Sequence, residues 1–264
     1  MFSNQTHFQL KDNSKKAIFT IFLMIAFLLY SNYSTAQHKE IAVANFERVV
    51  ISPHIQVVFK EANTESVTIE SINVPMENLN VYVKNNTLNV YLEGAKITGD
   101  DNEEYISGNK LEYASYDGTV VRAIINYKKL STVDLRGEER FVFEDNIVAD
   151  KLRLKVFGTS QVYINSVDIN KLMVSIYGES YLEIKDGVVK NQRFTAYGEG
   201  TINVSNVSSN ETKLTAYGDG SFQLNVSDKL KVNSYGEATV SYSGTPELNK
   251  GIVIGETKIT KVNF

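Results

Sequence analysis

A glycine recurs through the second half of the chain at a nearly constant interval. Successive copies are 18 to 21 residues apart, so that Gly158 and Gly178, for example, are separated by 20 residues. A fixed period near 20 residues indicates a stacked architecture in which each repeat is one structural unit. The repeat glycines are Gly137, Gly158, Gly178, Gly198, Gly218, Gly236 and Gly255.

Apolar and polar residues alternate on both sides of each repeat glycine. Around Gly178 the apolar positions are Val174 and Ile176 before it, then Leu182 and Ile184 after it. A period of two is typical of half-buried β-strands. Glycine suits the corner between two strands because it adopts positive φ without steric cost. Each repeat therefore predicts a strand, a glycine corner, a second strand and a polar return.

These repeats predict an all-β fold, a parallel β-helix with rungs of roughly 20 residues over residues 119–264. One repeat cannot bury its apolar row alone, so neighbouring repeats must stack on it. Stacked rungs lie ~4.8 Å apart, which turns each aligned position into a column of like residues. Leucine-rich repeats share the period, but the chain lacks their asparagine consensus and helical return.

The strand pattern continues off the period in residues 37–118. This segment is expected to form an N-terminal β subdomain, or irregular first rungs that cap the open end of the stack. Two apolar-rich runs, 81–83 and 88–92, flank Lys84-Asn85-Asn86-Thr87, which predicts a tight hairpin. Residues 93–118 are rich in Asp, Glu and Gly and predict an acidic loop.

The first 36 residues have the features of a secretory signal peptide. Lys11, Lys15 and Lys16 precede an apolar run of 14 residues, 17–30, and Ser34-Thr35-Ala36 supplies small residues for cleavage. The run is shorter than the ~20 residues that span a bilayer, which favours a cleaved signal over a retained anchor. We therefore expect an exported chain with no membrane span after cleavage.

Composition excludes several classes of function. Removing three Lys and one Asp with residues 1–36 leaves 24 basic and 30 acidic residues, a net charge of −6 that disfavours nucleic-acid binding. Without cysteine there is no disulfide, thiolate metal site or lipidated N-terminal cysteine. The sequence has no phosphate-binding glycine loop and no Gly-x-Ser-x-Gly motif. We expect no catalytic residues, no metal and no cofactor.

Several stretches resemble the head GIN domain family, autotransporter-adhesin-type proteins of Gram-negative envelopes. Residues 46–52 (FERVVIS) are similar to the opening of that family, 80–92 to its strand–turn–strand, and 121–127 to its entry into the repeats. The resemblance covers about 41–262. It implies an all-β fold with β-helical character and no established catalytic residues. It also implies a location in the periplasm, at the outer-membrane periphery or on the cell surface of a Gram-negative bacterium.

Two columns beside the repeat glycine are the candidate ligand-binding residues. The column before it is aromatic, and alternation directs it outward, although the corner could also turn it inward. The column after it is acidic in six of seven repeats. A structural aromatic ladder with solvated turn carboxylates is one interpretation; an exposed row suited to sugar rings is the other. The candidates are Tyr177, Tyr197, Tyr217, Tyr235, Glu179, Glu199, Asp219 and Glu237.

The sequence favours a non-enzymatic exported β-helix that binds a surface glycan or an envelope protein, or that serves structurally in the envelope. The alternative is a polysaccharide-cleaving enzyme on the same scaffold. Such enzymes need long loops that form a cleft. From Gly137 onward the repeats have almost no insertions, so only residues 93–118 could build one.

The signal peptide generates a first prediction. The mature chain is expected to begin at Gln37, because the small residues that precede it follow the apolar run at the distance that signal cleavage requires. Intact-mass spectrometry of the protein purified from its native host checks this. A mass that retains residues 1–36 would contradict it.

Overall fold

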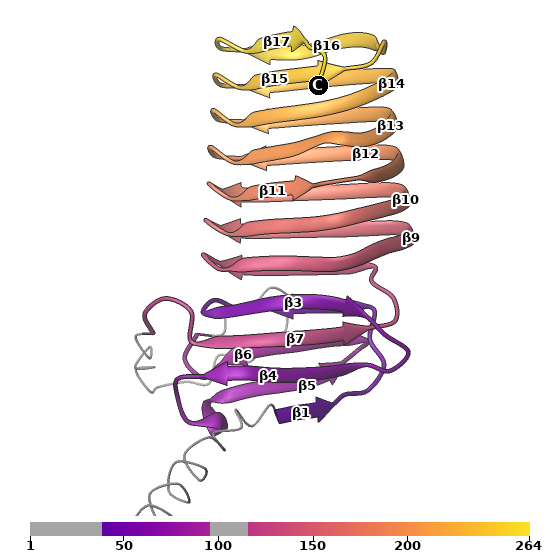
Figure 1. The fold of residues 1–264 in the computed structure, drawn as a ribbon. Coiled ribbons are helices and arrows are strands. Elements are labelled where there is room, and N and C mark those ends of the chain that lie inside the picture. The colour runs from indigo at the N-terminus through magenta and orange to yellow at the C-terminus, as the bar shows by residue number, and fades with distance from the viewer. Residues whose placement is uncertain (1–38, 96–115) are drawn as a thin grey trace, which may run out of the picture. The chain divides into compact units, whose positions relative to one another are not determined.

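The computed structural model describes residues 39–95 and 116–264, which are mostly β-strand (Figure 1). The predicted signal peptide lies outside the described residues, as does most of the predicted acidic loop. All seventeen strands belong to one hydrogen-bonded sheet that winds as a parallel β-helix, which confirms the predicted fold class. No helix in the described part is long and apolar enough to cross a membrane.

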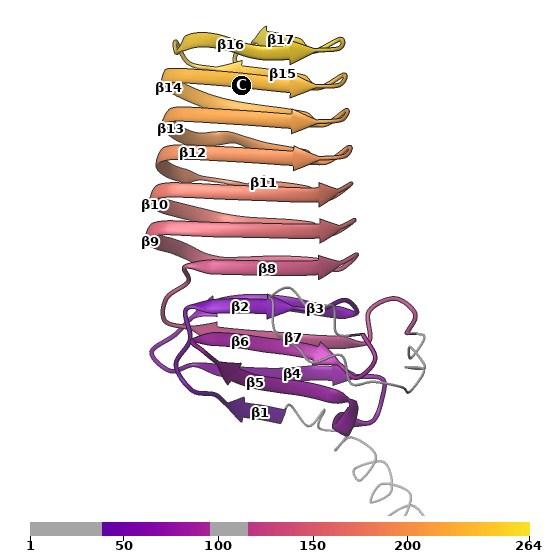
Figure 2. The same ribbon diagram turned by 180° about the vertical axis from the view of Figure 1, so that it is seen from behind.

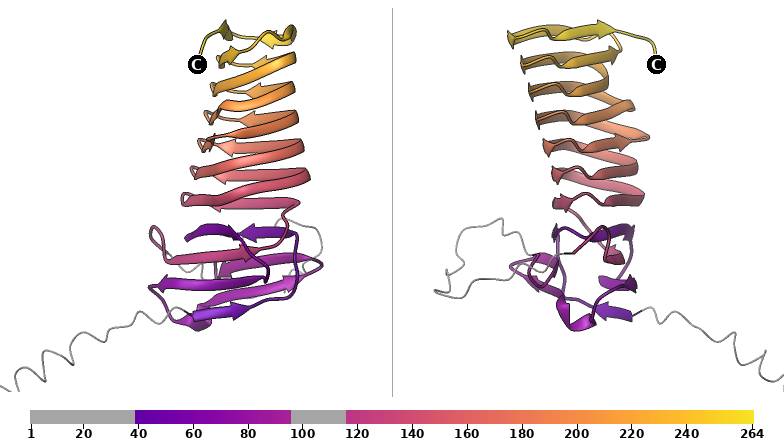
Figure 3. Two further views of the ribbon diagram at one scale, coloured as in Figure 1. Left: turned by 45° about the vertical axis from the view of Figure 1, so that its right-hand side comes forward. Right: turned by 90° about the vertical axis from the view of Figure 1, so that its left-hand side faces the viewer.

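The repeats form successive turns of the coil, which stack at regular spacing in the side views of Figure 3. Each turn pairs in parallel with the turns above and below it. The strands of these turns are β8 (Thr132–Gly137), β9 (Arg140–Gly158), β10 (Gln161–Gly178), β11 (Tyr181–Ile184), β12 (Gly187–Tyr197), β13 (Thr201–Tyr217), β14 (Ser221–Tyr235), β15 (Thr239–Ser243), β16 (Glu247–Ile254) and β17 (Lys258–Lys261).

The register aligns equivalent residues of neighbouring repeats. Within β10, residues 161–164 pair with β11, whereas the segment that ends at Tyr177 pairs with β12. Each turn therefore has a post-glycine segment and a pre-glycine segment, the names we use below for the strands that follow and precede the repeat glycine. The inward residues of both segments, such as Ile164 and Val174, are at most 1% exposed. The core of the coil lies between the two segments.

The glycine corner of each turn lies in close backbone contact with the corner of the adjacent turn. Gly178 has a φ of 115°, and a Cβ added there would lie 2.4 Å from the carbonyl oxygen of Gly158 in the adjacent rung. Both the backbone conformation and the close approach therefore require glycine. Beside this corner, the buried Ser180 donates a hydrogen bond from Oγ to the same Gly158 oxygen, at 2.9 Å. Backbone contact between adjacent corners keeps the repeats in register.

The N-terminal strands continue the coil below the repeats (Figure 2). Strand β2 pairs in parallel with both β6 and β8, and β3 pairs in parallel with both β7 and β9. The sheet thus runs across the predicted boundary between 37–118 and 119–264. The division of the chain into two domains at that boundary stays a prediction. The remaining elements are β1 (Lys39–Ala42), β2 (Arg48–Ile51), β3 (Ile55–Glu61), β4 (Ser66–Ile72), η1 (Met76–Asn78), β5 (Leu79–Lys84), β6 (Thr87–Leu92) and β7 (Val121–Tyr127).

Antiparallel pairing replaces parallel pairing in the lowest part of the coil. Strand β4 is antiparallel to both β1 and β7, and β5 is antiparallel to β6. The β5–β6 connection is the predicted hairpin, in which Asn85 and Asn86 both have positive φ, at 51° and 61°. Asparagine tolerates this conformation and is favoured in two-residue hairpin turns of type I′. The hairpin prediction is confirmed.

Glu139 joins the N-terminal strands to the first repeat. Its side chain is buried at the position that Ser160 and Ser180 occupy in later repeats. Its Oε1 accepts a hydrogen bond from the backbone N–H of His54 at 3.0 Å, and Oε2 accepts one from Glu138 at 2.9 Å. Burial raises the pKa of the Glu139 carboxyl above its ordinary value, against the lowering effect of these hydrogen bonds.

Burying a charge in the middle of the coil tests the register. Ile184 is 1% exposed, so Ile184→Asp should lower the free energy of unfolding by about 3–5 kcal/mol, because it buries a carboxylate without a partner. Thr201→Asp, at an outward position of the next rung, is the matched control and should change it by only about 0.5 kcal/mol. Chemical denaturation measures both. Equal effects of the two substitutions would show that the inward and outward positions are misassigned.

The Glu139 carboxyl predicts a pH dependence of stability. Because its pKa is raised in the folded chain, its stabilising contribution is complete below the ordinary pKa of 4.5 and is lost as pH rises through the raised value. The free energy of unfolding of the wild type, relative to Glu139→Gln, should therefore fall with rising pH in this window and then level off. Urea titrations of both proteins across that range check it. A difference that is constant or rises with pH would refute the assignment.

Candidate functional site

The four predicted tyrosines form one outward row on the pre-glycine segments. Tyr177, Tyr197 and Tyr217 are 38%, 41% and 39% exposed, which resolves their direction as outward. Their rings are nearly parallel, within 3–7° between neighbours. The ring centroids are 5.0 Å apart between Tyr177 and Tyr197, 4.8 Å between Tyr197 and Tyr217, and 4.9 Å between Tyr217 and Tyr235. The spacing follows from the rung spacing of the sheet.

Stacking decides which part of each ring a ligand could reach. Both faces of Tyr197 and Tyr217 are covered by neighbouring rings, so the exposed parts are the ring edges and the phenol groups. Stacking of sugar rings on the tyrosines would need open ring faces, and within the row these faces are covered. An aromatic edge carries partial positive charge, whereas the face is negative. The row therefore offers positive edges and hydroxyl groups to oxygen-rich ligands.

The row is longer than the four tyrosines. Phe157 stacks on Tyr177 with a centroid distance of 4.6 Å and an angle of 5°. The Arg136 guanidinium lies 4.9 Å from the centroid of Phe157, and its Nε donates a hydrogen bond to Asp134 at 2.9 Å. A cation over an aromatic face is attracted by the ring quadrupole. Arg136 and Phe157 thus complete this end of the row.

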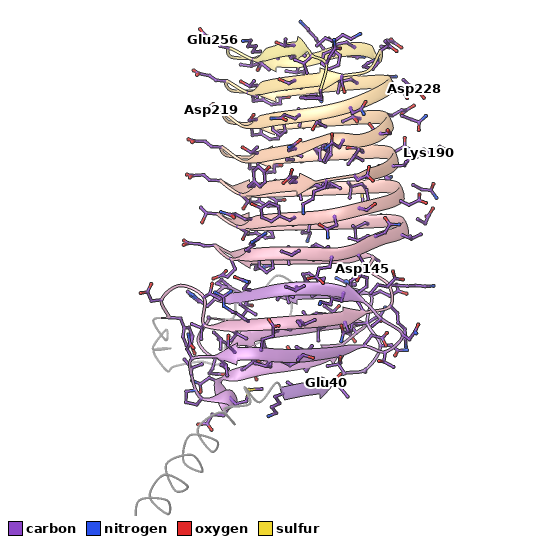
Figure 4. The ribbon with its side chains drawn as sticks, viewed as in Figure 1. Glu40, Asp145, Lys190, Asp219, Asp228 and Glu256 are labelled. Carbon is purple, nitrogen blue, oxygen red and sulfur yellow. The ribbon has the colours of Figure 1, made fainter. Side chains whose placement is uncertain are left out.

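The acidic column lies along the glycine corners, next to the tyrosine row. Glu179, Glu199, Asp219 and Glu237 are all exposed. Asp219 and Glu256 mark this edge of the coil in Figure 4, and Lys190 and Asp228 mark the opposite bend. Asp219 Oδ1 accepts a hydrogen bond from the Glu237 backbone N–H at 3.1 Å. The structure therefore brings the eight predicted residues together as two adjacent columns.

A recess of about 650 Å³ lies where the first repeat meets the N-terminal strands. One of its walls is Phe157, so it lies at the Arg136 end of the aromatic row. Within it, Nδ1 of His54 is 2.8 Å from the carbonyl oxygen of Gly118, and the ring of His54 lies 5.6 Å from that of Tyr116. The lining residues are Pro53, His54, Tyr116, Asp117, Gly118, Thr119, Arg136, Gly137, Glu138, Glu139, Phe157 and Gly158.

The chemistry of these columns is suited to binding. Their exposed carboxylates, phenols and ring edges can accept or donate hydrogen bonds along several rungs. Across residues 39–95 and 116–264, no group of three or more His, Asp or Glu side chains is arranged to hold a metal ion.

Sequence reasoning identified the tyrosine and acid columns but not the recess. The aromatic and acidic columns repeat at a fixed distance from the glycine, and a period of this kind is visible in one sequence. The recess depends on His54 and Gly118, which are far from the repeats in sequence and reach them only because β3 pairs with both β7 and β9. The positive φ of His54, 71°, is a property that the sequence pattern does not reveal.

Solved structures of proteins from Bacteroides and Parabacteroides share this fold. A "putative adhesin" of Bacteroides fragilis superposes with a TM-score of 0.70 at 17% identity, covering 85% of this chain and 96% of the other. A "putative lipid binding protein" of Parabacteroides distasonis gives 0.65 at 18% identity, with 86% and 96% covered. A "putative adhesin" of Parabacteroides merdae gives 0.60 at 19% identity, with the same coverage. Identities this low show a shared fold alone.

The family relationship rests on the sequence itself. No curated protein matches the chain. Residues 45–246, which include the strands from β2 to β15, match the family described as "Putative auto-transporter adhesin, head GIN domain". The match extends over well more than half of the chain and agrees with the resemblance found in the sequence. The chain belongs to the head GIN domain family.

Proposed function

We propose that the chain is a non-enzymatic module of the bacterial envelope that binds a surface glycan through its tyrosine row and the adjacent acidic column. The family to which the chain belongs is named for adhesins, which supports a binding role. The predicted signal peptide supports export, with the periplasm, outer-membrane periphery or cell surface as destinations. An envelope protein is the other partner that such a surface would suit.

One observation carries the proposal: the tyrosine row is exposed over several consecutive rungs. Tyr177, Tyr197 and Tyr217 each leave about two fifths of their surface to solvent, although the inward neighbours of each are almost fully buried. A large aromatic residue with one polar end is the type enriched where proteins meet partners. Repetition at the rung spacing gives an extended ligand several equivalent contacts, so that weak single contacts add up to useful affinity.

A binding role also accounts for the carboxyl groups better than a cleaving role. Glycosidases hold one carboxyl group in an environment that keeps it protonated, opposite a second carboxylate. The corner carboxylates Glu179, Glu199 and Asp219 are exposed on one edge. Glu139 is buried, but both of its oxygens accept hydrogen bonds from backbone amides, and the bond from His54 joins the N-terminal strands to the first repeat.

Two substitutions in the row test the proposal. Tyr197→Phe with Tyr217→Phe keeps the stacked rings and removes two hydroxyl groups, so the melting temperature should change little. Binding of the purified mature chain to isolated envelope polysaccharide should weaken about tenfold, since each lost hydrogen bond is worth roughly 0.5–1.5 kcal/mol. Replacing both residues by Ala should abolish binding, and it should also destabilise the chain, because it removes stacked contacts worth ~0.5–1.5 kcal/mol each.

A matched control comes from the post-glycine segments. Tyr163 and Tyr181 are also neighbours, with ring centroids 5.7 Å apart, but they lie on the other side of the coil. The corresponding double Phe variant should bind like the wild type. Unchanged binding by both row variants, or equal losses in row and control, would rule out the tyrosine row as the site.

A further inference from the structure

The pre-glycine segments carry three outward columns side by side. Alternation places the residues two and four positions before each tyrosine on the same face as that tyrosine, and the register aligns them between rungs. Columns two residues apart on a strand are separated by about 6.6 Å. A row of short polar side chains therefore lies between the tyrosine row and a row of long side chains. The middle row is Ser175, Thr195, Thr215 and Asn233.

The outer row is cationic. It contains Arg153, Arg193, Lys213 and Lys231, with Met173 between the two arginines. We call these four basic residues the cation column. Its two arginines are exposed and its two lysines half-buried. The chain as a whole is acidic, whereas this column is basic.

The cation column has no internal counter-charge. Within the described residues, none of its four members makes an ion pair, whereas nearby Lys155 lies 4.0 Å from Asp134. Glu211 occupies the same face one column farther from the tyrosines, and it pairs in register with Lys229 of the next rung. Like charges opposite one another on adjacent strands repel. Arg193, Lys213 and Lys231 are stacked in this way, and a bound polyanion would relieve their repulsion.

We propose that the ligand of this face is an anionic polysaccharide, whose carboxylates pair with the cation column while its sugars contact the middle row and the tyrosine row. The tyrosine row lies between the cation column and the acidic column, so the polymer's carboxylates are kept apart from the acidic side chains, which are left to accept hydrogen bonds from sugar hydroxyls. The inference rests on the proposed function, because it names the ligand class of the same surface. The middle row supplies hydroxyl and amide groups to sugar hydroxyls. The positive edges of Tyr197 and Tyr217 suit an oxygen-rich, negatively charged chain.

The same geometry disfavours other polyanions. Single-stranded nucleic acid binds proteins largely by stacking its bases on aromatic faces, and the faces within the tyrosine row are covered by one another. An anionic membrane surface is bound by side chains that insert apolar groups between lipids. In the rungs that carry the tyrosines, the three columns present one aliphatic residue, Met173, which is half-buried, and the exposed apolar residues Ile252, Val253 and Ile254 are confined to the last rung. A repeating hydrophilic polymer fits all three columns.

The test uses the purified mature chain and two forms of one polymer, polygalacturonate and its fully methyl-esterified counterpart. Calorimetric titration should show binding to polygalacturonate and at least tenfold weaker binding to the ester, which lacks the charges. Raising the NaCl concentration about tenfold should weaken binding to polygalacturonate. Salt screens the attraction between opposite charges and reduces the free energy gained when the polymer releases its counterions on binding. Equal affinity for both polymers, or no binding to polygalacturonate, would overturn the proposal.

Two charge-matched variants locate the contact. Arg193→Ser with Lys213→Ser should bind polygalacturonate at least tenfold more weakly than the wild type. Lys185→Ser with Lys190→Ser removes two charges near the opposite bend, where Figure 4 places Lys190, and should bind within twofold of the wild type. Equal affinity of the two variants would refute the assignment to the cation column. Tighter binding to phosphatidylglycerol vesicles or to oligodeoxythymidine than to polygalacturonate would refute a polysaccharide as the ligand.

The two proposals fail in different ways. If binding to envelope polysaccharide depends on Tyr197 and Tyr217 but not on Arg193 and Lys213, the anionic class is wrong and the proposed function stands. If polygalacturonate binding depends on the cation column while the tyrosine variants bind envelope polysaccharide normally, the tyrosine row is not the site. In that case the cation column alone carries the recognition.

Discussion

The structure depends on close contact between the backbones of successive glycine corners. A Cβ at Gly158, Gly178 or Gly198 would come within 2.3–2.7 Å of a carbonyl oxygen in the adjacent rung. Because no side chain separates the corners, each turn can lie at the spacing that the backbone hydrogen bonds of the sheet set, and this spacing is repeated in every column. The tyrosine rings stack because each occupies the same position in its rung, so the distance between neighbouring rings equals the distance between rungs. The same holds for the buried column of apolar residues inside.

The repeat region could be predicted because one spacing determines it. A glycine every 18 to 21 residues and alternation on both sides specify the strands, the corner and the inward positions such as Ile184. The type I′ hairpin at Asn85 and Asn86 could likewise be predicted from local residues. The pairing of β2 with both β6 and β8 could not, because parallel pairing between distant segments leaves no periodic trace in either one.

The candidate site shows the same division. The sequence identified the tyrosine and acid columns, whose members recur at fixed positions beside the glycine. Whether the rings would face outward, and whether their faces or edges would be free, depended on corner geometry that spacing does not encode. The basic residues illustrate a different difficulty. Arg153, Arg193 and Lys213 also recur with the period, but Met173 interrupts them and lysine is common on any solvated strand.

The position of β2 has a consequence for how the chain reaches its fold. Glu47, just before this strand, accepts hydrogen bonds from the backbone and side chain of Ser131, which lies 84 residues further on. The junction between the N-terminal strands and the first repeat therefore closes only after most of the first half of the chain has emerged, and the loop-closure entropy must be paid before these contacts form. Each later turn needs only its predecessor, about 20 residues away. Slow closure of this junction followed by rapid addition of turns is the folding order that this topology favours.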